Sequence, residues 1–303
     1  ETAGNVRLHV LPTDQFKTYA ISVYIGHPLT ESTVTPVALT PFVLRRGTAK
    51  LKETKQFRER LDDLYGAGFG FDVNKRGDYQ IVQFRFDMIH NDFVSEKESL
   101  LAQALSFIGD VVTDPALENG VFRNKYVEGE KETVRKRIEA IVNDKIRYAA
   151  ERCIQEMCKD EPYRLHPLGK AADLADITPE SLYESYRKWL EVSPIDIYVV
   201  GNTSMAEVKP LAEAAFRWNR PQAAVYERKP AQVRTAEPKT VVERLDVTQG
   251  KLNMGLRTPV TYADDDYPAM LMYNGILGGY PHSKLFLNVR EKASLAYYAS
   301  SRL

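Results

Sequence analysis

Cysteine is scarce in this sequence, and neither sign of charge is in excess. Among its 303 residues only Cys153 and Cys158 are cysteines. They lie five positions apart in a segment of helical pattern, which puts them on different faces, so they form neither a zinc knuckle nor a disulfide framework. We therefore expect a reducing cytoplasm. The 41 basic and 41 acidic residues cancel, so no overall field favours nucleic acid or an anionic membrane.

Long apolar runs and several familiar enzyme motifs are also missing. No stretch reaches the length of a membrane span and no signal peptide opens the chain, although a start at Glu1 is compatible with a trimmed leader. There is no G-x-S-x-G, no Walker-type loop, and no G-x-G-x-x-G after a strand. With 44% hydrophobic and 27% charged residues, the composition is that of a globular protein of one or two domains.

Histidine is too sparse for a local metal site. A helical zinc site needs two histidines at i and i+4. The five histidines have no pair closer than eighteen positions; they are His9, His27, His90, His166 and His282. We therefore expect the chain to have no metal or other cofactor of its own.

Hydrophobic periodicity predicts an α+β domain over residues 1–218. Strands are predicted at 6–11, 19–25 and 195–200, and a hairpin that turns at 75–77. The second strand of this hairpin puts Val82, Phe84, Phe86 and Met88 on one face, so one side of the sheet is core and the other is wet. Helices are predicted at 34–46, 53–65, 97–113, 121–159 with a break near Asn143, 178–191 and 204–218.

A linker and a second domain are predicted beyond this point. Residues 219–239 contain three prolines without periodicity, which is typical of a linker. Residues 240–303 then repeat the order of the first domain, with strands at 240–248 and 252–260, helices, and an aromatic strand at 295–299. These few strands and helices bury too little apolar surface for a full domain. We therefore expect the second domain to be truncated here.

The stretch LGGYPHSKLFLNVREKASLAYYASS, residues 277–301, contains two candidate binding residues. Arg290 is predicted near the end of a short helix, and Tyr297 at the start of the strand that follows. A guanidinium fork and a phenol held in this way can hydrogen-bond a carbonyl from one side. The spacing alone fits a solvated Arg and a half-buried Tyr better.

The segments LGG, LF and VREKxxLAYxxSS resemble the second-domain signature of the insulinase/pitrilysin (inverzincin) zinc peptidases and of mitochondrial processing peptidases. In that family an Arg and the Tyr seven residues later hold the substrate at the scissile bond, and the resemblance places this R/Y pair on Arg290 and Tyr297. It implies two related domains, each a mostly antiparallel sheet with helices on one face.

The resemblance also implies a zinc site that the matching positions lack. The family binds zinc with an inverted HxxEH pentad on a helix, together with a distant Glu. Matching EGEKETVRKRI to the distant helix puts Arg137 at that third ligand position. Alignment on Arg46-Gly47-Thr48 places the pentad on Ala38, Leu39, Thr40, Pro41 and Phe42. Both histidines and the general base are therefore missing.

These observations predict a non-catalytic, substrate-binding subunit of a heterodimeric zinc peptidase. Zinc is expected only in a homologous partner, and the substrate is a peptide. The segment from Asp144 to Arg152 follows a D-K-x-x-Y-A-x-x-R pattern that resembles firmicute partners of this kind. Two alternatives stay open: a scaffold like the core subunits of respiratory complexes, and a stand-alone module that adds an extended peptide to an edge strand. The intact Arg290 and Tyr297 argue against the scaffold.

Overall fold

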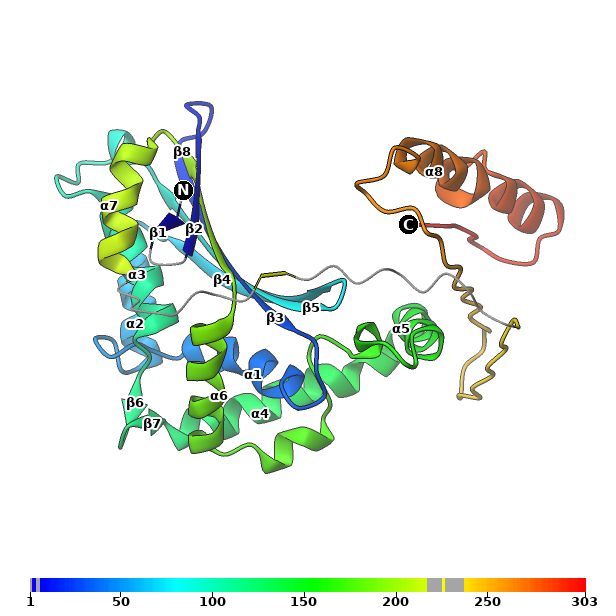
Figure 1. Ribbon diagram of the computed structural model, residues 1–303, viewed down its shortest axis with the longest axis horizontal. Helices are drawn as coiled ribbons and strands as arrows, with labels where there is room; N and C mark the ends of the chain where they lie inside the picture. The colour runs from blue at the N-terminus through cyan, green and yellow to red at the C-terminus, as the bar shows by residue number, and fades with distance from the viewer. Residues whose placement is uncertain (1, 4–5, 217–224, 227–236) are drawn as a thin grey trace. The chain divides into compact units, whose positions relative to one another are not determined.

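A computed structural model describes residues 2–3, 6–216, 225–226 and 237–303, which fall into two units (Figure 1). The first consists of residues 1–226 with 249–253, and the second of 227–248 with 254–303. The linker predicted at 219–239 lies mostly outside the described residues and stays a prediction. Within the described part of the chain, no helix combines the length and apolar character that crossing a bilayer requires.

A six-stranded sheet forms the centre of the first unit, in the spatial order β1-β2-β8-β3-β5-β4. All neighbouring strands are antiparallel except β2 and β8, so the predicted mostly antiparallel sheet is confirmed. The strands are β1 (Thr2–Ala3), β2 (Val6–Pro12), β3 (Thr18–Pro28), β4 (Gly68–Arg76), β5 (Tyr79–Ile89) and β8 (Ile195–Gly201). A separate small ladder joins β6 (Leu117–Glu118) to β7 (Val121–Phe122).

The long strands bury every second residue, as the sequence pattern predicts. The residues of β5 predicted to share one face are all buried, and Ile21 and Val23 of the adjacent strand β3 are buried on the same side. The intervening residues, such as Ser22, Tyr24 and Gln83, are only partly buried. One face of the sheet is therefore the core and the other is wet.

Helices of the first unit cover the buried face, with α1, α3 and α7 packed on the sheet (Figure 1). The long predicted helix is broken near Asn143, as expected, because Asp144 accepts hydrogen bonds from the N–H groups of Ile146 and Arg147 and caps a new helix. The helices are α1 (Val34–Leu44), α2 (Thr54–Asp63), α3 (Leu100–Thr113), α4 (Asn124–Glu139), α5 (Lys145–Met157), α6 (Pro179–Val192) and α7 (Met205–Ala215), with 3₁₀ turns η1 (Asn91–Phe93), η2 (Ala140–Asn143), η3 (Pro162–Arg164) and η4 (Ala172–Asp176).

Helix α1 is buried on all sides: only Pro36 of its eleven residues keeps substantial exposure. It contacts α4, α6 and β5, so it lies between the sheet and an outer layer of helices. Its sequence, VTPVALTPFVL, carries no charge, which is typical of a helix buried all round. Pro41 lies inside the helix, where it offers no N–H to the turn before it.

The second unit contains α8 (Tyr267–Asn274) and two π-helical segments, η5 (Gly275–Gly279) and η6 (Phe286–Lys292). The helix predicted at 267–277 is thus present as α8 and η5. The strands predicted at 240–248, 252–260 and 295–299 are wrong, since these residues carry no regular structure. A strand is stabilised by its neighbour, and the described residues of this unit contain no paired strand.

Candidate functional site

Two of the predicted degenerate zinc positions, Phe42 and Arg137, are in contact in the structure. Ala38, Pro41 and Phe42 are neighbours on α1 and are all buried, Phe42 with 1% of its surface exposed. Arg137 comes from α4, and its guanidinium carbon lies 4.9 Å from the centre of the Phe42 ring. The two halves of the site, far apart in the sequence, therefore meet at the contact between α1 and α4.

The side chains at these positions do not fit the zinc ion that the resemblance implies. Alanine, proline and phenylalanine offer no lone pair to a metal, and an arginine brings a fixed positive charge. Within the described residues, no group of three or more His, Cys, Asp or Glu side chains is arranged to hold a metal ion. The site therefore has no means of activating water through a metal.

Three further residues complete the site, and the sequence reasoning missed them. Glu130 of α4 has no exposed surface, and its Oε1 accepts a hydrogen bond from Arg46 Nε at 2.5 Å. The same oxygen lies 3.5 Å from Arg45 Nη2, whereas Glu130 Oε2 has no hydrogen-bond partner among the described residues. Arg45 also lies over two rings, 5.8 Å from the centre of Phe42 and 5.7 Å from that of Phe71 on β4.

A spacing argument could have found Glu130. It precedes Arg137 by seven residues in the same charged segment, and residues seven apart lie two turns along one face of a helix. Arg137 contacts α1 in the structure. A carboxylate on the same face of α4 is therefore expected to lie near α1 as well. The buried position of Glu130 could not be read from the segment, because charged residues surround it on both sides.

The structure does not join the predicted substrate-binding pair. Arg290 lies on η6, where its guanidinium carbon is 4.4 Å from the centre of the Phe286 ring and its Nε is 3.7 Å from Glu291 Oε1. Tyr297 follows in a segment without regular structure and is 82% exposed. In the described structure no hydrogen bond or ring contact links Arg290 to Tyr297, and their role in substrate binding stays a prediction.

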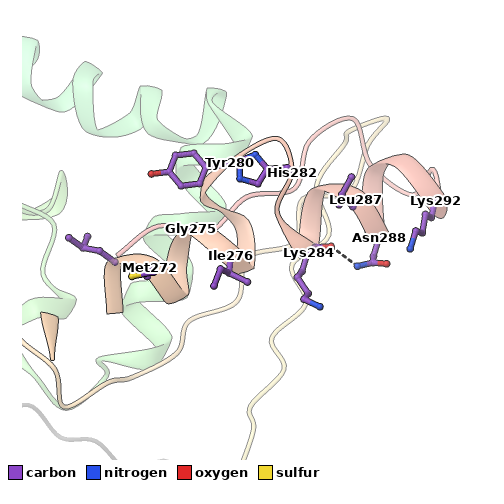
Figure 2. A pocket seen from close by; sticks show the side chains of 10 residues that line it. Met272, Gly275, Ile276, Tyr280, His282, Lys284, Leu287, Asn288 and Lys292 are labelled. Carbon is purple, nitrogen blue, oxygen red and sulfur yellow. Dashed lines mark hydrogen bonds between the residues drawn. The ribbon is translucent and has the colours of Figure 1, made fainter. Parts of the chain in front are cut away.

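A pocket of about 630 Å³ lies in the second unit between α8, η5 and η6 (Figure 2). On its rim the rings of Tyr280 and His282 stack with centroids 5.5 Å apart, and Asn288 Nδ2 donates to the carbonyl of Lys284 at 2.8 Å. In the described structure neither Arg290 nor Tyr297 lines it. The lining residues are Leu271, Met272, Gly275, Ile276, Tyr280, His282, Lys284, Leu287, Asn288 and Lys292.

A second group of titratable side chains surrounds Lys75 at the end of β4. Its Nζ donates to the carbonyls of Tyr163 at 2.7 Å and Leu165 at 3.1 Å, and burial lowers the pKa of Lys75. Burial, with the nearby charges of Lys75 and Arg147, lowers the pKa of His166 to about 4. Because the lysine donates to backbone carbonyls, this group ties η3 to the sheet and supplies no nucleophile.

Comparison with known proteins decides the family. A profile described as "Peptidase M16 inactive domain" matches residues 176–303. The "Probable inactive metalloprotease YmfF" of Bacillus subtilis (strain 168) is 42% identical over 300 residues, which cover 99% of this chain and 70% of that protein. The chain belongs to the M16, or pitrilysin, peptidase family. The resemblance inferred from the residue motifs is therefore confirmed.

Solved structures agree with this assignment to M16. A "conserved protein from Enterococcus faecalis V583" is 30% identical, with a TM-score of 0.82 over 99% of this chain and 71% of that one. The "peptidase M16 inactive domain from Pseudomonas fluorescens" has a TM-score of 0.67 at 17% identity and covers 98% of this chain and 68% of that one. At such low identity the second match shows the fold alone, and it supports the α+β class.

Proposed function

We propose that this M16 protein is the non-catalytic, substrate-binding subunit of a heterodimeric zinc-dependent peptidase in the cytoplasm. The replacement of the zinc ligands is the observation that carries the proposal. Ala38, Pro41 and Phe42 belong to the packed core, and Arg137 lies over Phe42. A chain that keeps the fold around such a site can contribute surface and binding groups to a peptidase, while the metal comes from a zinc-bearing homologue.

The division of work follows from the chemistry available in this chain. The partner supplies zinc and the base that activates water. Arg290 and Tyr297 supply hydrogen-bond donors to a peptide carbonyl. Both side chains are accessible, since Arg290 keeps 43% of its side-chain surface and its ion pair with Glu291 is long at 3.7 Å, and Tyr297 is 82% exposed. We expect the segment 293–299 to order against the peptide and to bring the phenol towards Arg290.

Co-expression with an M16 homologue that keeps HxxEH tests the proposal. We expect a stable heterodimer on size exclusion, and peptide cleavage that requires both chains and stops when the glutamate of the partner's pentad becomes glutamine. If the homologue cleaves equally well alone, the proposal is wrong. A heterodimer that forms without affecting cleavage would favour the scaffold alternative instead.

A further inference from the structure

Guanidinium groups gather around Phe42, a position that the resemblance aligns with a zinc ligand. Arg137 and Arg45 both lie over the ring of Phe42, with their guanidinium carbons 4.9 Å and 5.8 Å from its centre. Arg46 lies next to Arg45 on the chain and contacts the same carboxylate, that of Glu130. Three permanent cations therefore converge on the contact between α1, α4 and β4.

The charges of this cluster do not cancel. Glu130 is its carboxylate, and its Oε1 is engaged by Arg46 at 2.5 Å and only distantly by Arg45 at 3.5 Å. In the described structure Arg137 makes no ion pair or hydrogen bond and is exposed. Among the described residues of this cluster, three guanidinium groups against one carboxylate leave two positive charges.

The two under-used arginines still have donors to offer. A guanidinium carries five N–H donors in a planar fork that fits a carboxylate with two parallel hydrogen bonds. Contact with the rings of Phe42 and Phe71 holds Arg45 and Arg137 in place without using these donors. Phe71 lies on β4, the strand at the edge of the sheet, so a chain that runs along this edge passes the cluster.

We propose that this guanidinium cluster binds the C-terminal carboxylate of a peptide, with Arg137 and Arg45 as the binding groups and buried Glu130 as the residue that positions Arg45 and Arg46. The proposal deepens the proposed function and rests on it for the class of ligand, a peptide. The cluster carries a net positive charge but no Lewis acid, so it anchors a chain end and cleaves nothing.

Binding to the chain alone, without partner or zinc, tests this proposal. The probe is a fluorescein-labelled hexapeptide with a free C-terminal carboxylate, compared by anisotropy with the same peptide as a C-terminal amide. A third peptide carries an internal glutamate and an amidated end, and inorganic phosphate is added as a competitor. We expect the free acid to bind at least about tenfold tighter than either amidated peptide.

The substitutions Arg137→Gln and Arg45→Gln are each expected to weaken the free acid by about tenfold and to leave the amide unchanged. Arg135→Gln is the matched control, because Arg135 lies on the same helix, is exposed, and pairs with Glu132 instead. Its affinity should stay within about twofold. Thermal unfolding of each variant checks that the fold is kept.

Equal binding of acid and amide, or an unchanged affinity in both arginine variants, would overturn the proposal. Equal binding of the internal glutamate peptide, or displacement by phosphate at the concentration of the peptide, would show a general anion site and would also overturn it. Since no partner is present, these results are independent of whether the heterodimer forms.

Discussion

The guanidinium carbon of Arg137 lies 4.9 Å from the centre of the Phe42 ring. The resemblance to zinc-binding relatives assigns a histidine to the position of Phe42 and a glutamate to that of Arg137. A cation–π contact thus takes the place of two bonds to a metal. Such a contact contributes about 0.5–1 kcal/mol at an exposed site, so it helps to hold α4 on α1 without a metal.

Metal analysis provides the simplest check on this site. We expect the purified chain, dialysed without chelator, to contain far less than one zinc per molecule, because the positions of Ala38, Pro41, Phe42 and Arg137 offer no ligand. Elemental analysis by plasma mass spectrometry measures the content. About one zinc per chain, lost when any one of the five histidines is replaced, would contradict the assignment.

Restoring the pentad should not restore a peptidase. The variant Ala38→His, Pro41→Glu, Phe42→His leaves Arg137 at the third ligand position, where its charge repels the metal. It also removes an almost fully buried ring, which we expect to cost about 2–5 kcal/mol of unfolding free energy. Denaturant unfolding and a peptide-cleavage assay with added zinc are the measurements. Robust metal-dependent cleavage by this variant would show that the placement of Arg137 is wrong.

Glu130→Gln should destabilise the first unit more than Arg45→Gln. Glutamine keeps the shape but removes the charge that Arg46 and Arg45 share, and the site is fully buried on the Glu130 side. We expect a loss of about 1–3 kcal/mol for Glu130→Gln, and about 1 kcal/mol or less for Arg45→Gln, whose side chain is 38% exposed. Urea unfolding of both variants measures the difference, and equal stabilities would contradict a central role for Glu130.

Kinetics of the reconstituted heterodimer test the R/Y pair. A hydrogen bond from a charged donor contributes about 1.5–3 kcal/mol, so Arg290→Ala should lower kcat/KM by about ten- to a hundredfold. Tyr297→Phe removes only a hydroxyl group and should cost less. Size exclusion checks that the complex still forms. Full activity in both variants, with an intact complex, would contradict substrate binding by Arg290 and Tyr297 and favour the scaffold alternative.

Acid should destabilise the chain through His166. In the folded chain its pKa is lowered from 6.5 to about 4, so between these values the unfolded chain binds a proton that the folded chain does not. The contribution of His166 to the free energy of unfolding is therefore fully present above about pH 6.5, and it falls as the pH is lowered towards 4. The full loss of unfolding free energy from this residue is about 3 kcal/mol.

His166→Gln should flatten this part of the pH profile, measured by urea unfolding at pH 4.5 and pH 7. His282→Gln is the control, since His282 is exposed in the second unit and its loss should leave the slope unchanged. Burial also lowers the pKa of His27, so some dependence should persist in the His166 variant. An identical slope in wild type and His166→Gln would contradict the prediction.

Periodicity predicted the first unit well because its elements differ in period and carry local boundary signals. The alternation in β5, the break in the long helix near Asn143 and the start of a helix near Thr178 all appear where the sequence indicates. The apolar sequence of α1 likewise predicted a helix. Each of these signals is local, and the packing of the core agrees with it.

The candidate site was only partly predictable, for a physical reason. Motif alignment identified Ala38, Pro41, Phe42 and Arg137, and the fold places Arg137 of α4 against Phe42 of α1. The role of Glu130 depends on burial by a helix distant in sequence, which no local pattern encodes. In the second unit the aromatic alternation of 295–299 predicts a strand. Alternation gives a segment one apolar side, but a strand also needs a neighbouring strand to pair with.

The parallel pairing of β2 with β8 has a consequence for how the chain folds. Leu8 lies opposite Ile197, and β8 also pairs with β3, so the central strand of the sheet is the last of its strands to leave the ribosome. Until then β2 and β3 have no common neighbour, and their edges are open to other chains. Contacts of such long sequence separation slow folding, and open edges invite aggregation in the nascent chain. Slow translation or chaperone binding before residue 195 should therefore affect the yield of this protein more than either would after β8 has formed.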